Sequence, residues 1–326
     1  MSLRTILILS AVLAASAAAQ EGSLNGPVSG LVFDQHARAV RPMMGVPGGA
    51  YLGVAVASGV ELAAVSPNGR AMVVSRQGKL LLGRHTADGF DWSALAEDLP
   101  VPDQIRWNRA STAVAVVASG RPLLWRTTGE TAGAISLAAI PEGPITALAV
   151  EDSAGALVVA IAGDTDGGIY RADAEAARLL ARLANPGPLA LDGRGGLFFV
   201  DRDRQEVLVI SEYSRASDIQ LLAGSAHGLA DLVGLALASG GRSLLIADRK
   251  TRRLIQWDLA EFAVSRTIDV GFEPARLEPF GDGKLFLLSH RSQSSDTLYV
   301  LDHGAEPAVY FVPAGDAEPG QPVVED

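Results

Sequence analysis

One stretch of the chain occurs twice, and this repeat constrains the fold more than any other feature. Residues 197–212, LFFVDRDRQEVLVISE, align without a gap with residues 244–259, LLIADRKTRRLIQWDL. Both copies have a charged segment between two apolar runs, and Asp203 of the first copy becomes Lys250 in the second. A metal site would not tolerate that exchange, whereas a solvent-exposed turn would. The repeat therefore predicts a two-stranded hairpin, and we expect Asp201 and Asp203 to be exposed turn residues without a metal.

Weaker copies of the same form, strand, polar turn and strand, extend in both directions. They are residues 71–84, 113–126, 157–173 and 285–302. Equivalent starting positions at residues 72, 114, 157, 197, 244 and 285 are separated by steps of 42, 43, 40, 47 and 41 residues. A period of this length with several short strands per unit is typical of β-propeller blades.

Each unit can be divided into four strands. The inner strand is nearly all apolar, as in ITALAV, because a blade is packed on both faces by its neighbours. A tight turn such as Pro67-Asn68-Gly69 follows, then the hairpin, then an outer strand such as AVYFVP. The sequence therefore predicts an all-β fold, a single β-propeller domain over residues 28–312. Six units fill residues 60–312, and residues 29–53 hold part of another. We favour seven blades with an incomplete first blade; six blades are the alternative.

The blade pattern resembles those of known propeller families. LFFVDRDRQEVLVI and SLLIADRKTRRLIQWDL are similar to the NHL-type blade, and VSPNGRAMVVSRQGKLLL to the YVTN-type and TolB-type blades of bacterial exported propellers. Trp257-Asp258 resembles the dipeptide that ends the third strand of WD40 blades. No Gly-His dipeptide of the WD40 type recurs, and the Asn and His of the NHL turn are absent. The resemblance implies the propeller fold over residues 60–312 and assigns no single family.

The first twenty residues, MSLRTILILSAVLAASAAAQ, have the form of an export signal. Arg4 precedes a short apolar stretch, and Ala17-Ala18-Ala19 fits the small-residue cleavage rule. We expect a signal peptide over residues 1–19, cleavage between Ala19 and Gln20, and a periplasmic or secreted protein. An uncleaved anchor helix is the alternative, although the apolar run is short for a membrane span. The Ala- and Gly-rich composition is typical of a bacterium.

Composition and charge argue against several classes of binding partner. The formal net charge is −10 and basic residues form no long block, which argues against nucleic acid and anionic membranes. No later segment is apolar enough for membrane insertion. The chain has no cysteine, so it has no disulfide, thiolate metal site or Cys nucleophile. The Pro- and Gly-rich acidic tail, residues 313–326, is expected to be disordered, and the protein to be a monomer.

No catalytic or metal-binding motif is recognisable. The five histidines occur in no metal-ligand spacing; they are His36, His85, His227, His290 and His303. The stretch Asp164-Thr165-Asp166-Gly167 falls short of a calcium loop, which needs six to eight oxygen ligands. The chain has neither a GxSxG elbow nor a GxxxxGK[ST] loop. We therefore expect no cofactor and no metal.

The connections from the outer strand of one unit to the inner strand of the next are the best candidates for a site. They read VPDQIRW (101–107), IPEGPI (140–145), NPGPL (185–189), SAHGLADL (225–232) and FEPARL (272–277). Such loops meet at one mouth of the central channel, and we expect the turns within a blade on the opposite face or the rim. The charged and histidine side chains that these connections bring to the mouth are the candidate ligand-binding residues: Asp103, Arg106, Glu142, His227, Asp231, Glu273 and Arg276. The alternative is a solvated ring of mutual ion pairs.

Three functions remain open. The first is a non-catalytic exported binding or scaffold module that presents its channel face to a protein, peptide or glycan. The second is a metal-dependent hydrolase or lyase of the propeller lactonase type, with a metal held by Glu142, Asp103, Asn108 and Asn185. The third is a structural module of an envelope assembly. The lack of a catalytic constellation favours the first.

Overall fold

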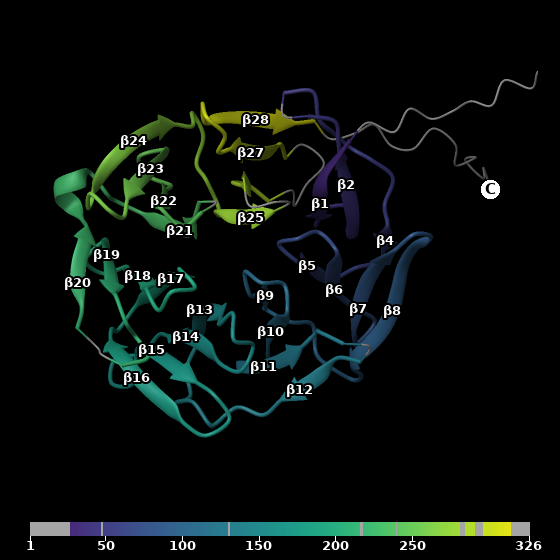
Figure 1. Cartoon of the computed structure of the whole chain (residues 1–326), viewed down its shortest axis with the longest axis horizontal. Coiled ribbons are helices and arrows are strands. Elements are labelled where there is room, and N and C mark those ends of the chain that lie inside the picture. The colour runs from purple at the N-terminus through teal and green to yellow at the C-terminus, as the bar shows by residue number, and fades with distance from the viewer. Residues whose placement is uncertain are drawn as a thin grey trace, which may run out of the picture.

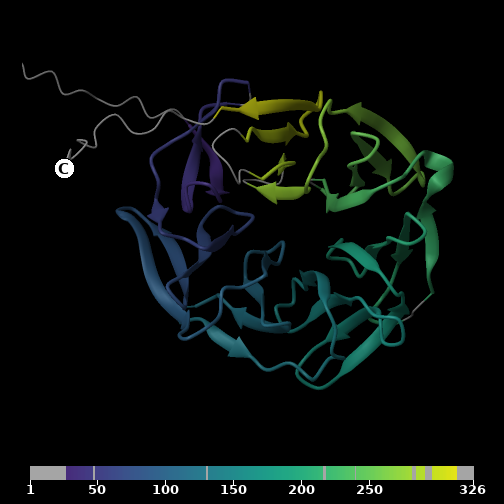
Figure 2. The same cartoon turned by 180° about the vertical axis from the view of Figure 1, so that it is seen from behind.

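The structure is a computed structural model that describes residues 27–46, 48–129, 131–215, 218–238, 240–280, 284–290 and 296–313. The predicted signal peptide and residues 314–326 of the predicted tail lie outside this part of the chain and stay predictions. Seven antiparallel sheets form a ring around a central opening, seen from both faces in Figures 1 and 2. No helix among the described residues is long and apolar enough to cross a bilayer.

Each sheet is a blade built from strands consecutive in sequence, numbered here from the N-terminus. Blade 1 contains β1 (Val28–Asp34), β2 (Ala39–Met44), β3 (Tyr51–Leu52) and β4 (Ala57–Ser58). Blade 2 contains β5 (Leu62–Val65), β6 (Ala71–Arg76), β7 (Lys79–Thr86) and β8 (Gly89–Ala96). Blade 3 contains β9 (Gln104–Trp107), β10 (Ala113–Ala118), β11 (Arg121–Arg126) and β12 (Gly133–Ile135). Blade 4 contains β13 (Ile145–Val150), β14 (Leu157–Ile161), β15 (Gly168–Ala172) and β16 (Ala177–Arg182).

The remaining three blades follow the same order. Blade 5 contains β17 (Pro186–Leu191), β18 (Leu197–Asp201), β19 (Glu206–Ile210) and β20 (Gln220–Ala223). Blade 6 contains β21 (Leu232–Leu237), β22 (Ser243–Asp248), β23 (Arg253–Asp258) and β24 (Ala263–Asp269), and the 3-10 turn η1 (Ser225–His227) precedes it. Blade 7 contains β25 (Glu278–Phe280), β26 (Leu285–Leu287), β27 (Leu298–Asp302) and β28 (Ala308–Val312). The predicted seven-bladed propeller with an incomplete first blade is confirmed.

The hydrophobic core is divided into seven clusters, one between each pair of neighbouring blades. Apolar packing joins the first and last blades of the ring: Val32 and Leu52 of blade 1 lie in one cluster with Phe280 and Val312 of blade 7. The second strands β10, β14, β18 and β22 are buried at every position, because each is covered by neighbouring blades on both faces.

One hairpin motif recurs in three blades and forms the turn between the second and third strands. The second strand ends in a buried aspartate, Asp201 or Asp248, whose carboxylate accepts the N–H of the residue three positions later, at 3.2 and 3.0 Å. The fourth residue after the aspartate, Gln205 or Arg252, has a positive φ of 53° or 57°. The charged segment is thus a turn, as predicted, and Asp203 is exposed. The prediction that Asp201 is exposed is wrong, because its carboxylate closes the turn beneath the surface.

Blade 1 contains the same hairpin between its first two strands. Asp34 is buried and accepts the N–H of Ala37 at 3.1 Å, and Arg38 has a φ of 48°. Strands β1 and β2 therefore correspond to the second and third strands of the other blades. The short strands β3 and β4 both pair with β2 and take the place of the outer strand. The element missing from blade 1 among the described residues is the inner strand.

These hairpin turns lie on the same face as the blade-to-blade connections. The side-chain amide of Asn185, in the connection to blade 5, donates to Asp203 at 3.1 Å. In blade 6, Arg249 of the hairpin donates its backbone N–H and its Nε to Asp231 of the connection, at 2.9 and 2.8 Å. The prediction that these turns occupy the opposite face or the rim is wrong, because each four-stranded blade brings its second turn back to the entry side.

Candidate functional site in the central channel

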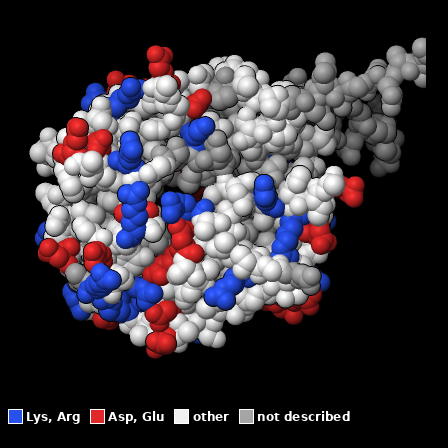
Figure 3. All heavy atoms as spheres, viewed as in Figure 1, with Lys and Arg blue, Asp and Glu red and all other residues white. Residues whose placement is uncertain are grey.

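The central channel is a cavity of about 2130 Å³. The inner strands of blades 2 to 7 line it, together with β1. Aliphatic residues such as Leu189, Leu191 and Leu237 make up much of its wall. Basic and acidic side chains are interspersed over the face in Figure 3, and both occur around the central hollow. Charged residues such as Arg70, Arg109 and Asp302 also line the channel, so the contacts between charged side chains distinguish one part of it from another.

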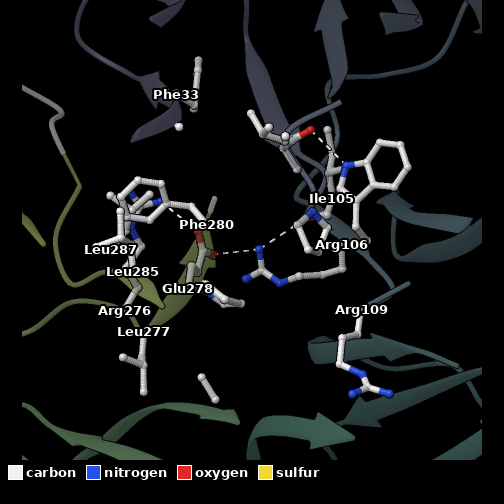
Figure 4. Close-up of a pocket in the computed structure, with 18 of the residues that line it drawn as sticks. Phe33, Ile105, Arg106, Arg109, Arg276, Leu277, Glu278, Phe280, Leu285 and Leu287 are labelled. Atoms are coloured by element: carbon white, nitrogen blue, oxygen red, sulfur yellow. Dashed lines mark hydrogen bonds and ion pairs between the residues drawn. The ribbon is translucent and has the colours of Figure 1, made fainter. Parts of the chain in front are cut away.

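A cluster of three charged side chains crosses the channel mouth. Arg106 from β9 of blade 3 reaches Glu278 at the start of β25 in blade 7, with Nη1 2.8 Å from Oε1. Arg276, two residues before Glu278, donates its Nη1 to the other carboxylate oxygen at 2.9 Å. Figure 4 shows the guanidinium of Arg106 extended toward Glu278, whereas that of Arg109 points away from the cluster. One carboxylate thus joins two blades that are not neighbours in the ring.

Local structure fixes each member of the cluster. In β9, Ile105 is buried in the core between blades 2 and 3, and the alternation of the strand leaves Arg106 on the channel side. Arg276 is held by a hydrogen bond from its Nε to the carbonyl of Ser289 at 2.8 Å. Glu278 is the first residue of β25, so its backbone is set by pairing with Leu287 of β26.

Burial gives the cluster its electrostatic character. Only 12% of the Arg276 side chain and 29% of the Glu278 side chain are exposed, against 45% for Arg106. Burial by itself would raise the pKa of Glu278, but the two arginines reverse this and hold it at about 2. Burial, followed by the charge of Arg276, lowers the pKa of the neighbouring His290. At neutral pH the cluster therefore carries two positive charges, one negative charge and a neutral imidazole.

One hydrogen-bond donor of the cluster is unused. The Nη2 of Arg276 is buried and has no hydrogen-bond partner. A buried donor without an acceptor costs free energy, about 1–3 kcal/mol and more for a charged group. An incoming carboxylate or phosphate would balance the excess positive charge, and it would satisfy Nη2 once the guanidinium of Arg276 turns toward the channel. The cluster is therefore suited to hold an anionic group.

The sequence placed seven candidate residues at one mouth, and three of them line the channel: Asp103, Arg106 and Arg276. Only the two arginines belong to the charged cluster. Glu142, His227, Asp231 and Glu273 are not in the channel wall. Asp231 pairs with Arg249 at 2.8 Å and Glu273 with Arg252 at 3.2 Å. These two residues therefore form the mutual ion pairs that were the alternative to a ligand-binding role. Glu142 is exposed.

His227 lies away from the other candidates. It belongs to η1, and its ring packs edge-on against Trp257, with centroids 5.0 Å apart. Trp257 is part of the core between blades 5 and 6. The Nδ1 of His227 accepts the N–H of Gly224 at 3.2 Å. His227 does not reach the channel mouth as expected, because the connection before blade 6 folds into this turn and packs on the core.

Sequence reasoning missed Glu278 and His290. Glu278 lies just after the connection FEPARL, at a position assigned to the inner strand. A charged residue at the start of an otherwise apolar inner strand is a signal that could have identified it. His290 follows β26 and comes near the cluster only through the fold. Its sequence context carries no such signal.

The depressed pKa of Glu278 predicts an acid-dependent loss of stability. Its pKa is about 2 in the folded protein against an ordinary value of 4.5, so the unfolded chain binds more protons between these values. The stabilisation from this group is therefore complete above about pH 4.5 and is lost as the pH falls toward 2. Glu278→Gln should flatten the dependence of the melting temperature on pH in that window.

The matched control is Glu273→Gln, which removes an exposed carboxylate outside the channel. The control should keep the pH dependence of the unchanged protein, as followed by circular dichroism melts from pH 2 to 7. Identical profiles for Glu278→Gln and the unchanged protein would contradict the prediction.

The described residues contain no group of three or more His, Asp or Glu side chains that could hold a metal ion. Both oxygens of Glu278 already contact arginines. The side chains of Asn108 and Asn185, the amides considered for a metal, are engaged with Thr112 and Asp203 at 2.8 and 3.1 Å. The geometry thus favours recognition of an anion over coordination of a cation.

No protein-family model and no curated protein sequence matches the chain. Among solved structures, 1212 chains are similar to it. One, from a crystal structure of a nidogen/laminin complex, has 17% identity and a TM-score of 0.48, covering 75% of this chain and 93% of its own. Another, Saccharomyces cerevisiae Sqt1, has 10% identity and a TM-score of 0.56, covering 93% of this chain and 91% of its own. The likeness to Sqt1 extends over nearly the whole of both chains, and it shows that this chain has the β-propeller fold.

Proposed function

We propose that this protein is an exported, non-catalytic binding module that holds an acidic side chain of a protein or peptide partner at its channel mouth. The single observation that carries the proposal is the buried Nη2 of Arg276, which has no acceptor. Arg106 and Arg276 both pair with the carboxylate of Glu278. An acidic side chain from a partner supplies the missing acceptor.

The shape of the site favours an inserted segment over a flat contact. The channel is far larger than the cluster, and aliphatic residues make up much of its wall beyond the cluster. A peptide or loop with an acidic residue beside apolar residues would place its carboxylate on the arginines and its apolar groups against that wall. Export is supported by Arg4, the apolar stretch and Ala17-Ala18-Ala19 at the N-terminus.

Binding can be measured by fluorescence anisotropy with a labelled acidic peptide that alternates Glu and Leu, and with a Gln and Leu peptide for comparison. We expect saturable binding of the acidic peptide alone. Arg276→Gln should weaken it about 10- to 100-fold, because a charge-assisted hydrogen bond in a partly buried site contributes about 1.5–3 kcal/mol. Arg106→Gln should weaken it less, because Arg106 is more exposed.

The matched control is Arg253→Gln, which removes an exposed arginine paired with Asp269 outside the channel. Its affinity should equal that of the unchanged protein. Arg276→Lys keeps the charge without the planar fork and should show an intermediate loss if the fork binds the acid. Equal affinities for Arg276→Gln and Arg253→Gln, with both variants folded, would exclude the channel mouth as the site.

A further inference from the structure

The hairpins of blades 5 and 6 carry an arginine at the same position, directly after the buried aspartate. These arginines are Arg202 and Arg249, which align in the repeat. Each donates its backbone N–H to the carbonyl of the residue just before the inner strand, Asn185 in blade 5 and Asp231 in blade 6, at 3.1 and 2.9 Å. Asn185 and Asp231 are therefore equivalent, and the surroundings of the two arginines can be compared directly.

The arginine of blade 6 is neutralised within its own blade. The Nε of Arg249 donates to one carboxylate oxygen of Asp231 at 2.8 Å, and its Nη2 donates to the other at 3.4 Å. Half of the Arg249 side chain is exposed, at 50%, and Arg249 is not in the channel wall. This arginine therefore serves to join the hairpin of blade 6 to the connection that enters the blade.

Blade 5 lacks the equivalent acid. Asn185 stands in place of Asp231, and its side-chain amide donates to Asp203 at 3.1 Å. The residue of blade 6 that aligns with Asp203 is Lys250. Within the described part of the chain, the guanidinium of Arg202 has no hydrogen bond and no ion pair, and Arg202 lines the channel. The same turn thus presents a neutralised arginine in one blade and an unpaired one in the next.

A glycine in the inner strand makes room for Arg202. Gly187 is the second residue of β17, and a Cβ atom at this position would lie 3.1 Å from the Cγ of Arg202. The second residue of β21 in blade 6 is Val233. Arg202 is accordingly half-buried, whereas Arg249 is exposed. A half-buried charge is screened less by solvent and salt than an exposed one, so Arg202 attracts an anion more strongly.

The channel mouth therefore has two separate basic positions. Arg106 and Arg276 come from blades 3 and 7 and share Glu278, whereas Arg202 comes from blade 5. Figure 1 shows these three blades separated by blades 4 and 6 around the opening. Asp103 also lines the channel, but among the described residues no ion pair joins it to Arg202. A ligand with a single acidic group at the cluster would leave Arg202 unmatched.

We propose that the ligand is a diacidic segment of a protein or peptide, with one carboxylate at the cluster of Arg106 and Arg276 and a second at Arg202. The proposed ligand rests on the proposed function, because its first carboxylate takes the site described above. The planar guanidinium of Arg202 can donate two parallel hydrogen bonds to the second carboxylate. Because the two contacts come from different blades, they fix the position of the segment across the channel as well as its affinity.

Peptides with one and two glutamates measure the contribution of Arg202. A labelled peptide that alternates Gln and Leu receives one Glu, or two at increasing separations, and fluorescence anisotropy gives each affinity. For the unchanged protein, the best two-Glu peptide should bind at least about tenfold more tightly than the one-Glu peptide. Arg202→Gln should reduce this advantage to about twofold, the statistical gain from a second equivalent anchor. The affinity of the one-Glu peptide should not change.

A second variant transfers the ion pair of blade 6 into blade 5. Asn185→Asp combined with Asp203→Lys gives Arg202 the acidic partner that Arg249 has, and it should remove the advantage as Arg202→Gln does. The double substitution makes the chain more positive, so long-range repulsion cannot explain a weaker affinity for an acidic peptide. The matched control is Asp231→Asn, which releases Arg249 outside the channel and should keep the advantage.

The possible outcomes separate this ligand from the function on which it rests. Two-Glu peptides that bind the unchanged protein no better than the one-Glu peptide would overturn the diacidic ligand alone. The same holds if the advantage survives in both Arg202→Gln and the double variant, with each folded by circular dichroism. Absence of binding by every peptide would overturn the proposed function and the diacidic ligand together.

Discussion

Replacing Phe198 by alanine should lower the free energy of unfolding by about 3–5 kcal/mol, and Leu245→Ala by about 2–5 kcal/mol. The two residues align in the repeat, and only 4% and 0% of their surfaces are exposed. Phe198 of β18 packs with Leu244 of blade 6, and Leu245 of β22 packs with Phe286 of blade 7. Each therefore faces the following blade, and truncation leaves a cavity in the interface that holds two blades together.

The control for this pair is Phe311→Ala in β28, because 64% of Phe311 is exposed. A surface substitution of this kind should change the free energy of unfolding by no more than about 0.5 kcal/mol. Urea denaturation followed by tryptophan fluorescence measures all three variants. A loss below about 0.5 kcal/mol for Phe198→Ala would mean that β18 does not present this residue to blade 6.

The blade repeat could be predicted from the sequence because two local signals agree in every unit. Apolar runs of strand length are separated by turns with Gly, Asn or Asp, and the units recur at a nearly constant period. The run LFFVD, for instance, is buried at all five positions of β18. Such signals depend on neighbours within a few residues, so they can be recognised without knowing how the blades are placed around the ring.

The orientation of the turns could not be predicted in the same way. Asp201 reads as a solvent-exposed charge in the sequence, yet its carboxylate is buried because it accepts backbone N–H groups of its own turn. The hairpin of blade 1 shares the apolar run, the aspartate and the turn length with the other copies, but Gln35 stands where they have Arg202 and Arg249. Its equivalence therefore became visible through hydrogen bonds and the positive φ of Arg38.

The candidate site was predicted only in part for a related reason. Arg106 and Arg276 belong to connections that the sequence placed at the mouth, but their meeting on Glu278 depends on ring closure. Blades 3 and 7 are far apart in sequence and are not adjacent in the ring. His227 was placed at the mouth by its position in a connection, and packing against Trp257 holds it elsewhere.

Asp248→Asn should lower the free energy of unfolding by about 2–4 kcal/mol, although the side chain keeps its size. Asp248 has no exposed surface, and its carboxylate accepts three backbone N–H groups, from Ala230 at 2.6 Å, Asp231 at 3.3 Å and Thr251 at 3.0 Å. These bonds tie the hairpin of blade 6 to the connection that enters the blade. An asparagine side chain has one acceptor oxygen, and its amide nitrogen would face an N–H donor.

The matched control is Asp203→Asn in the hairpin of blade 5, where the aspartate is exposed and accepts one hydrogen bond, from Asn185. This control should stay within about 0.5 kcal/mol of the unchanged protein in urea denaturation. Hydrogen exchange of the Ala230 and Thr251 amides should accelerate in Asp248→Asn and not in the control, because only the first variant removes their acceptor. If both variants unfold at the same urea concentration, the buried aspartate is not what joins the hairpin to the connection, and solvent or other backbone groups must satisfy those amides.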